Sequence, residues 1–260
     1  MNVVRIDLQD RRVPALGGFN LTFLYLEARR LVRNRRTVIF TLVLPVILVF
    51  LFSANRRFGE PAGERIAAAT LIGIAVYGAM IAATAGGAMV SIERALGWSR
   101  QLRVTPLRPP AYIAIKLLIA MLLGLVSVGA VFAAGAYTGV RMAPETWILS
   151  GLLAWASSFV FASFGLFMGY LLPSENVMQI IGPVLAVFAF GGGLFIPVSL
   201  LPSTLQDIAP YSPTYGVAQI ARFPLLGGTF DATWVLGAVI WTLAFAGGAS
   251  LLFRRDTRRT

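Results

Sequence analysis

The stretch "SIERALGWSRQLRVTPLRPPAYIAIK" (Ser91–Lys116) carries charge between two segments that carry almost none. It holds six charged side chains, three prolines and one tryptophan. The 27 residues from Ile66 to Ile92 and the 24 residues from Leu117 to Val140 contain no charged side chain. A helix needs about 20 predominantly apolar residues to cross the hydrocarbon core of a bilayer. The flanking segments are therefore predicted membrane spans, and the charged stretch is the loop that joins them.

The composition of the whole chain agrees with a membrane protein. Of its 260 residues, 57% are hydrophobic and 13% are charged, and the mean hydropathy is +0.78. Soluble domains have about 45–50% apolar and about 25% charged residues. The net charge of +11 could also suggest nucleic acid as a partner, but that function needs a basic face on a folded soluble domain. No stretch is long enough for such a domain, so we expect no nucleic-acid partner.

The same length rule predicts an all-α membrane protein with six transmembrane helices. The charge-free windows are Thr37–Asn55, Ile66–Ile92, Leu117–Val140, Thr146–Ser174, Asn176–Gln206 and Ala232–Phe253. The fifth window is too long for one helix and is interrupted by "GGGLFIPVSLLP" (Gly191–Pro202). We therefore expect its helix at about residues 177–195 and re-entrant helices between spans five and six.

These windows divide the chain into three parts. Residues 1–36 form an N-terminal cytoplasmic segment, residues 37–253 the six-helix transmembrane domain, and residues 254–260 a basic cytoplasmic tail. Within the first part, "FNLTFLYLEARRLVRNRR" (Phe19–Arg36) has an apolar side and a polar stripe that includes Glu27 and Arg30. That pattern predicts an amphipathic helix lying in the inner membrane interface. A flexible basic tail is the alternative.

The distribution of Lys and Arg predicts the orientation, because short cytoplasmic loops retain these residues. With six spans both termini share a side, and 17 of the 22 Lys and Arg residues lie on that side. The loop from Ser91 to Lys116 lies there as well. We therefore expect a multi-pass protein of the bacterial plasma membrane with both termini in the cytoplasm.

Few residues are available for catalytic or metal chemistry. The chain has no cysteine and no histidine, which removes thiolate chemistry and the commonest metal ligand. The ionisable side chain nearest to the hydrocarbon is Lys116, and we expect its long stem to snorkel to the headgroups. The phosphate-binding pattern G-x-x-x-x-G-K-[ST] is absent. The chain is therefore expected to hold no cofactor and to be no enzyme, and any energy for transport comes from a partner.

Small residues within the predicted spans favour close contacts between helices over contacts with a substrate. They are the run Ala82–Ala88 and the glycines Gly135, Gly139, Gly165 and Gly169.

The charged loop resembles a segment of ABC-2 type transporter permeases, which runs E-R-x-x-G-T, then Leu, then T-P-L and a Lys at the head of the third span. The matching residues here are Glu93, Arg94, Gly97, Leu102, Thr105, Pro106, Leu107 and Lys116. Trp98 stands where the family usually has Thr. A second segment, Gly191–Arg222, is similar to the family's segment after the fifth span. It has matching residues at Phe195, Ile196, Pro197, Leu201, Pro202, Pro213, Tyr215 and Arg222.

The resemblance implies the membrane subunit of an ATP-binding cassette exporter, of the type V or drug- and antibiotic-efflux kind. Two permease subunits, identical or different, face each other, and each docks a separate ATPase subunit that binds ATP and Mg. The residues implied to couple to the ATPase are Glu93, Arg94, Gly97, Trp98, Arg103, Thr105 and Pro106. Ser174 and Glu175 are a second cytoplasmic contact, with Ser174 as the N-cap of span five.

The resemblance also implies a transport pathway that is closed on the outer side by the segment after span five. The expected pathway and gate residues are Phe188, Phe190, Phe195, Pro197, Pro202 and Tyr215. Aromatic surface without charge suits a hydrophobic or amphipathic substrate, such as a drug, an antibiotic or a lipid-like compound. Rings packed against lipid or neighbouring helices are the alternative.

Two other classes of function compete with the exporter. A non-transporting membrane scaffold would recruit a cytoplasmic partner through the same basic surface. A membrane-embedded enzyme is disfavoured by the missing catalytic groups.

Overall fold

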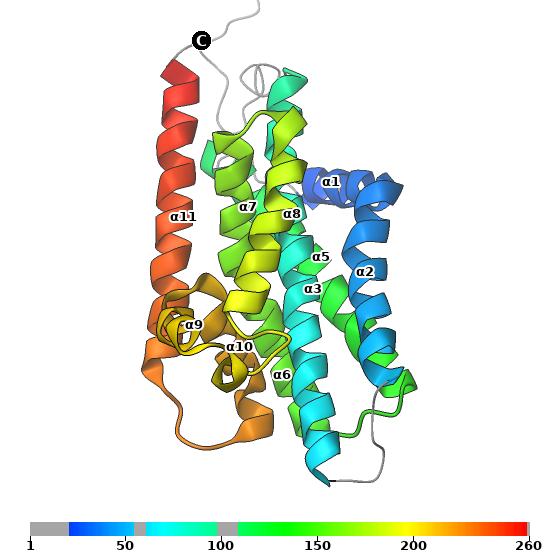
Figure 1. Ribbon diagram of the computed structural model, residues 1–260. Coiled ribbons are helices and arrows are strands. Elements are labelled where there is room, and N and C mark those ends of the chain that lie inside the picture. Colours follow the sequence, from blue (N-terminus) through cyan, green and yellow to red (C-terminus); the bar gives the residue numbers. More distant parts are fainter. Residues whose placement is uncertain (1–20, 55–60, 98–108, 259–260) are drawn as a thin grey trace, which may run out of the picture.

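The computed structural model describes residues 21–54, 61–97 and 109–258, and every regular element in these ranges is a helix. The bundle and the order of its helices are shown in Figure 1. The longer helices are α1 (Leu21–Arg33), α2 (Arg35–Ala54), α3 (Pro61–Ala95), α5 (Pro109–Tyr137), α6 (Pro144–Ser157), α7 (Phe159–Leu171), α8 (Ser174–Gly191), α10 (Pro213–Leu226) and α11 (Ala232–Arg258). The short helices are η3 (Val198–Leu200), α9 (Ser203–Ile208) and η4 (Ala209–Tyr211).

Five helical segments of the described chain are long and apolar enough to cross a membrane. They are Gly63–Ala95, Ala111–Tyr137, Pro144–Leu171, Ser174–Gly191 and Ala232–Arg255. The apolar stretch Thr41–Ser53 of α2 is shorter. The predicted all-α class is therefore confirmed, with about five long apolar helices.

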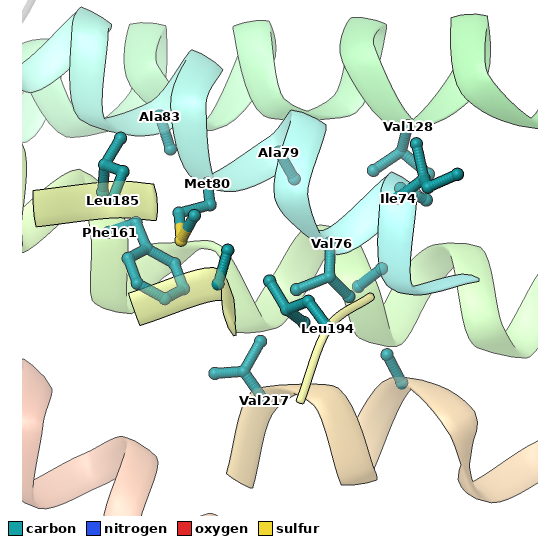
Figure 2. Close-up of a cluster of buried hydrophobic side chains, with 14 of the residues drawn as sticks. Ile74, Val76, Ala79, Met80, Ala83, Val128, Phe161, Leu185, Leu194 and Val217 are labelled. Atoms are coloured by element: carbon teal, nitrogen blue, oxygen red, sulfur yellow. The ribbon is translucent and has the colours of Figure 1, made fainter. Parts of the chain in front are cut away.

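Helix α3 forms the centre of the bundle. Of its apolar window, 67% is buried inside the protein, against 11% for the window of α11. Figure 2 shows Ile74, Val76 and Met80 of α3 among side chains from the surrounding helices. A central helix that is apolar on all sides is typical of a buried span. Helix α3 therefore contacts most of the other helices of the bundle.

Close helix contacts depend on glycines, as the sequence predicted. A Cβ atom at Gly165 of α7 would lie 2.2 Å from the carbonyl oxygen of Thr84, and one at Gly87 of α3 would lie 2.6 Å from that of Ala162. Gly135 likewise has Leu71 against it. Gly139 is different. A Cβ atom added at this residue would have no neighbouring atom within 4 Å, and the φ of Gly139 is +80°. The packing interpretation is wrong there, and Gly139 serves the turn after α5 instead.

The fourth apolar window forms one spanning segment, Pro144–Leu171, which is interrupted at Ser158 between α6 and α7. Helix α6 ends at Ser157 and α7 begins at Phe159. The hydroxyl of Ser158 donates to the carbonyl oxygen of Trp155 at 2.6 Å, and the indole N–H of Trp155 donates to Met121 of α5 at 2.8 Å. A serine that bonds back to the preceding turn bends a helix. The break thus arises from side chains and needs no proline.

The chain after α8 makes short helices, each started by a proline. Helix α8 ends at Gly191, four residues before the predicted end, and Gly193 follows with a φ of +76°. Pro197 precedes η3, and Pro202 precedes α9. Pro213 is the first residue of α10, where proline suits the helix start. Helix α10 then packs against α3, α6 and α11.

Candidate functional site

A cluster of charged side chains lies where α1 crosses α3 and α5, and its members are buried except for Arg30, whose side chain is 40% exposed. The cluster consists of Glu27 and Arg30 of α1, Glu93 of α3, and Tyr112 and Lys116 of α5, and is called the ion cluster below. Figure 1 shows α1 roughly perpendicular to the long helices, next to α2. The ion cluster thus joins α1, α3 and α5, which are far apart in the sequence.

Lys116 is the centre of the ion cluster. Its Nζ lies 2.5 Å from Oε1 of Glu93 and 3.0 Å from Oε2 of Glu27. Arg30 Nη1 lies 3.0 Å from Oε1 of Glu93 and 3.5 Å from Oε1 of Glu27. The hydroxyl of Tyr112 donates a hydrogen bond to Oε2 of Glu93. Both oxygens of Glu93 are therefore bonded.

Burial makes these contacts stronger than surface ion pairs. The side chains of Lys116 and Glu93 are 3% and 2% exposed. Two carboxylates and two cations also give the ion cluster no net formal charge. A buried charge is tolerated when it is paired and hydrogen-bonded, whereas removing one partner costs about 3–5 kcal/mol. The ion cluster therefore holds the three helices in one fixed arrangement.

Local sequence spacing places the members of the ion cluster. Tyr112 and Lys116 are four residues apart on α5, and Glu27 and Arg30 are three apart on α1, so each pair shares a helix face. The apolar side chains Phe23, Leu24 and Ala28 of α1 pack beside them on buried residues of α3 and α5. The polar stripe of α1 thus faces the protein. The expectation that Lys116 snorkels to the headgroups is wrong, because the two glutamates are close enough to pair with it.

Arg94 makes a second connection from the same turn of α3. Its Nη1 donates to the carbonyl oxygens of Gly169 at 3.2 Å and of Tyr170 at 3.0 Å, and the guanidinium lies 5.5 Å from the Tyr170 ring centre. These carbonyls are at the C-terminus of α7, where a cation is favourable. Glu93 and Arg94 therefore tie the end of α3 to α1, α5 and α7.

The predicted coupling residues are only partly within the described chain. Glu93 and Arg94 lie in the last turn of α3, just past the end of the predicted charge-free span at Ile92. Gly97 follows that turn with a φ of +71°. The remaining coupling residues lie outside the described residues: Trp98, Arg103, Thr105 and Pro106.

The second predicted contact is at the start of α8. Ser174 is the first residue of this helix, and Pro173 occupies the N-cap position without a side-chain hydrogen bond. The N-cap assignment of Ser174 is therefore wrong. Glu175 is exposed in the first turn, where an acidic side chain is favourable.

The predicted gate residues separate into different contacts. The ring of Phe195 lies 4.9 Å from Tyr77 of α3, 5.3 Å from Phe190 and 6.1 Å from Phe52 of α2, measured between ring centres. Phe188 packs 5.6 Å from Phe164 of α7 instead. Phe190 and Phe195 therefore contact each other, and Phe188 does not belong to their group.

The other three gate residues have backbone or interhelical roles. Pro197 and Pro202 stand at the N-caps of η3 and α9. Tyr215 lies on α10 beside α11, and its backbone N–H donates to the hydroxyl of Ser212 at 3.2 Å. These three residues and Phe195 all lie in the segment that follows α8, but only Phe195 makes ring contacts with Phe190 and Tyr77.

Arg222 of α10 is a further half-buried residue whose role the sequence did not reveal. Its guanidinium donates to the carbonyl oxygens of Ala69 on α3 at 3.1 Å, of Gly193 at 2.8 Å and of Leu194 at 2.6 Å. The Arg222 side chain therefore joins α10 to α3 and to the turn after α8, near the end of α3 that is opposite the ion cluster. We call this group the arginine clamp.

Some of these residues carried signals in the sequence. Arg222 belongs to the second segment that resembles the family. Glu27 belongs to the polar stripe of the predicted amphipathic helix, and Lys116 stands at the head of a predicted span. Their pairing was missed because α1 and α5 are separated by more than seventy residues. Among the described residues, no group of three acidic side chains could hold a metal ion.

Several apolar helices of membrane-spanning length define a multi-pass membrane protein. Residues 21–226 match the ABC-2 type transporter family, so the chain belongs to that family. It is 26% identical over 211 residues to "Putative transport permease YvfS" of Bacillus subtilis (strain 168). That alignment covers 80% of this chain and 85% of YvfS. The protein is thus a permease subunit of the ABC-2 type, a class that typically lacks an ATPase site and generally pairs with an ABC ATPase.

Proposed function

We propose that the protein is the membrane subunit of an ATP-driven exporter that moves a hydrophobic or amphipathic compound out of the cell. A separate ATPase supplies the energy, and two permease subunits with two ATPase subunits form the working complex. The observation that carries this proposal is the ion cluster, because it joins the interfacial helix α1 rigidly to two membrane helices.

The first step of the proposed mechanism takes place at the ion cluster. The ATPase pushes on α1 and on the loop that starts after Gly97. Since Lys116 contacts Glu27 and Glu93 at 3.0 and 2.5 Å, α1 moves together with α3 and α5. Arg94 passes the same displacement to α7 through its carbonyl contacts. Packed elements with fixed contacts shift as rigid bodies.

The second step takes place at the other end of α3. This helix has 35 residues, or about 52 Å at about 1.5 Å per residue. Its outer part is bonded by the arginine clamp to α10 and to the turn after α8. A displacement that begins at Glu93 therefore reaches the segment proposed as the outer gate without passing through a flexible loop.

The proposed topology has six spans, with α2 as the first, and both termini in the cytoplasm of a bacterium. The segment from Pro197 to Leu226 enters the outer leaflet without crossing the membrane. The lengths of these helices support this proposal. A membrane span needs about 20 residues, whereas α10 has 14 and η3, α9 and η4 are shorter still.

Single cysteines test this topology directly, because the chain has none of its own. We expect Gln101→Cys to react with a membrane-impermeant maleimide only after the cells are opened. Thr229→Cys, in the turn before α11, is expected to react in intact spheroplasts. Reaction of Gln101→Cys in intact spheroplasts would contradict the proposed orientation.

The export function is tested with the partner ATPase. The permease is co-expressed with the phosphate-loop ATPase of a neighbouring gene, purified as a complex and reconstituted into vesicles. We expect ATP-dependent movement of an amphipathic fluorescent dye. A complex that assembles and yet moves no tested amphiphile, with ATP turnover unaffected by the permease, would favour the scaffold function instead.

A further inference from the structure

A hollow of about 510 Å³ lies between η4, α10 and the first half of α11. Its volume is in the range of about 300–1,000 Å³ that is usual for small-molecule sites. The walls include four aromatic residues, Tyr211, Tyr215, Trp234 and Trp241. None of the residues that line the hollow is charged. The hollow is therefore chemically unlike the ion cluster and the arginine clamp.

Two glycines explain why the hollow exists. At Gly216 the helices α10 and α11 touch, since a Cβ atom there would lie 2.5 Å from the carbonyl oxygen of Trp234. At Gly237, one turn further along α11, no heavy atom lies within 4 Å of the Cβ position. The indole N–H of Trp241 donates to the carbonyl oxygen of Tyr211 at 3.0 Å and braces the hollow at its other end.

The hollow opens to the outside of the bundle along the exposed face of α11. Leu236 and Ile240 line it and are 58% and 55% exposed, on a helix whose spanning window is 11% buried. In a membrane, hydrocarbon chains surround such a face. From Thr233 to Trp241 the lining of α11 extends over roughly 12 Å. This shape suits one extended alkyl chain.

Polar side chains line the hollow at both of its ends. Thr233 lies at the start of α11, and Ser212 follows Tyr211, whose carbonyl oxygen is bonded to Trp241. Trp and Tyr side chains prefer the level between headgroups and hydrocarbon. The absence of charge in the walls excludes a phosphate inside the hollow, because a buried anion needs a partner. A hydrocarbon chain that lies along these uncharged walls, with its ester groups near Thr233 at the start of α11, fits these features.

We propose that this hollow is a binding site for one acyl chain of a membrane phospholipid, whose headgroup stays outside the hollow. The leaflet in which this lipid lies rests on the proposed topology, which places the start of α11 on the outer side. The bound chain fills the space between α10 and α11, so it supports the re-entrant segment on its membrane side. Helix α8 and helix α2 contribute no residue to the site.

A pair of glycine variants on α11 tests the site. Gly237→Leu fills the hollow, and Gly247→Leu is the matched control, because no atom lies within 4 Å of either Cβ position and Gly247 is not part of the lining. Each protein is reconstituted with phosphatidylcholine, washed extensively in detergent and extracted. Retained phospholipid is counted by mass spectrometry. We expect about one phospholipid per chain in the wild type and in Gly247→Leu, and a fall of at least about fivefold in Gly237→Leu.

Tryptophan fluorescence supplies a second measurement. Phosphatidylcholine brominated on its acyl chain should quench the washed wild-type protein, in which Trp234 and Trp241 are two of five tryptophans, more than it quenches Gly237→Leu, and headgroup-labelled lipid should quench less. Equal lipid retention in all three proteins, or no quenching after washing, would overturn the proposal. Retention of a different amphiphile in place of phospholipid would also overturn it. Neither measurement uses the ATPase or transport, so these results are independent of the export assay.

Discussion

At the residue scale, the protein treats its buried charges in two ways. In the ion cluster, Lys116 is matched by Glu27 and Glu93 at the end of the bundle. Arg222 instead donates to three backbone carbonyl oxygens. A planar guanidinium can bond several acceptors at once, whereas an ammonium acts as a point charge. Each residue type thus suits its place.

Removing the charge of Lys116 is predicted to destabilise the protein through its partners. Lys116→Met leaves Glu27 and Glu93 buried without their central cation, so we expect a loss of about 3–5 kcal/mol. The double variant Lys116→Met/Glu27→Gln restores neutrality and should be more stable than the single variant. Thermal unfolding in detergent measures both. Strictly additive effects of the two substitutions would contradict the pairing.

Arg222→Lys is predicted to loosen the arginine clamp although it keeps the charge. Lysine cannot reach three separated carbonyls in the geometry of a guanidinium, so we expect a loss of about 1.5–3 kcal/mol. The control is Arg65→Lys, because Arg65 makes one exposed bond, 2.7 Å to the carbonyl oxygen of Leu226, and should change stability by less than about 0.5 kcal/mol. Equal thermal shifts for the two variants would argue against the clamp.

At the scale of elements, α3 decides how the bundle is packed. It contacts α5 and α7 most extensively, and it also touches α2, α6, α8 and α10. Small residues allow its backbone to approach α7, as Gly165 does against Thr84. In membranes such close packing replaces the hydrophobic driving force, because lipid tails are as apolar as the helices.

Alanine at two glycines should therefore have opposite effects. Gly165→Ala places a methyl group 2.2 Å from the Thr84 carbonyl oxygen, and we expect overpacking to cost about 1–3 kcal/mol. Gly182→Ala on α8 meets no atom within 4 Å and should stabilise the helix by about 0.5–1 kcal/mol. Thermal unfolding compares them. A stabilised Gly165→Ala variant would show that α3 and α7 are not in contact there.

At the scale of the whole molecule, α3 connects two distant groups of bonds. The ion cluster is at one end of α3, and the arginine clamp holds the other end to α10. The aromatic group of Phe195, Phe190 and Tyr77 lies on the way between α3 and the chain that follows α8. In the proposed exporter, this arrangement links ATP hydrolysis at one membrane face to the gate at the other.

A single neutralising change is predicted to separate ATP hydrolysis from transport. Glu93→Gln weakens the bonds to Lys116 and Arg30, so we expect vesicle transport to fall by roughly tenfold while the ATPase still binds and turns over. Glu64→Gln, on an exposed side chain in the first turn of α3, is the control and should transport normally. Unchanged transport in Glu93→Gln would remove the ion cluster from the mechanism.

The sequence alone determined which class of protein this is. Long runs without charge, such as Ile66–Ile92 and Leu117–Val140, must be helical and buried in lipid or protein, because backbone groups in hydrocarbon need internal hydrogen bonds. The order of motifs between Glu93 and Tyr215 then indicated the ABC-2 type family. Both inferences use properties that are local along the chain, so they needed no knowledge of how the helices meet.

Only the tertiary structure decided what the charged residues do. The sequence predicts that Lys116 snorkels to the headgroups, whereas in the structure α1 brings Glu27 to pair with it. The sequence places Arg222 only in the segment after span five, whereas in the structure its guanidinium bonds to Ala69 and Leu194. The break at Ser158 also depends on Met121 of another helix. The physical reason is that hydropathy is fixed by neighbours in the chain, whereas the pairing of a buried charge is fixed by neighbours in space.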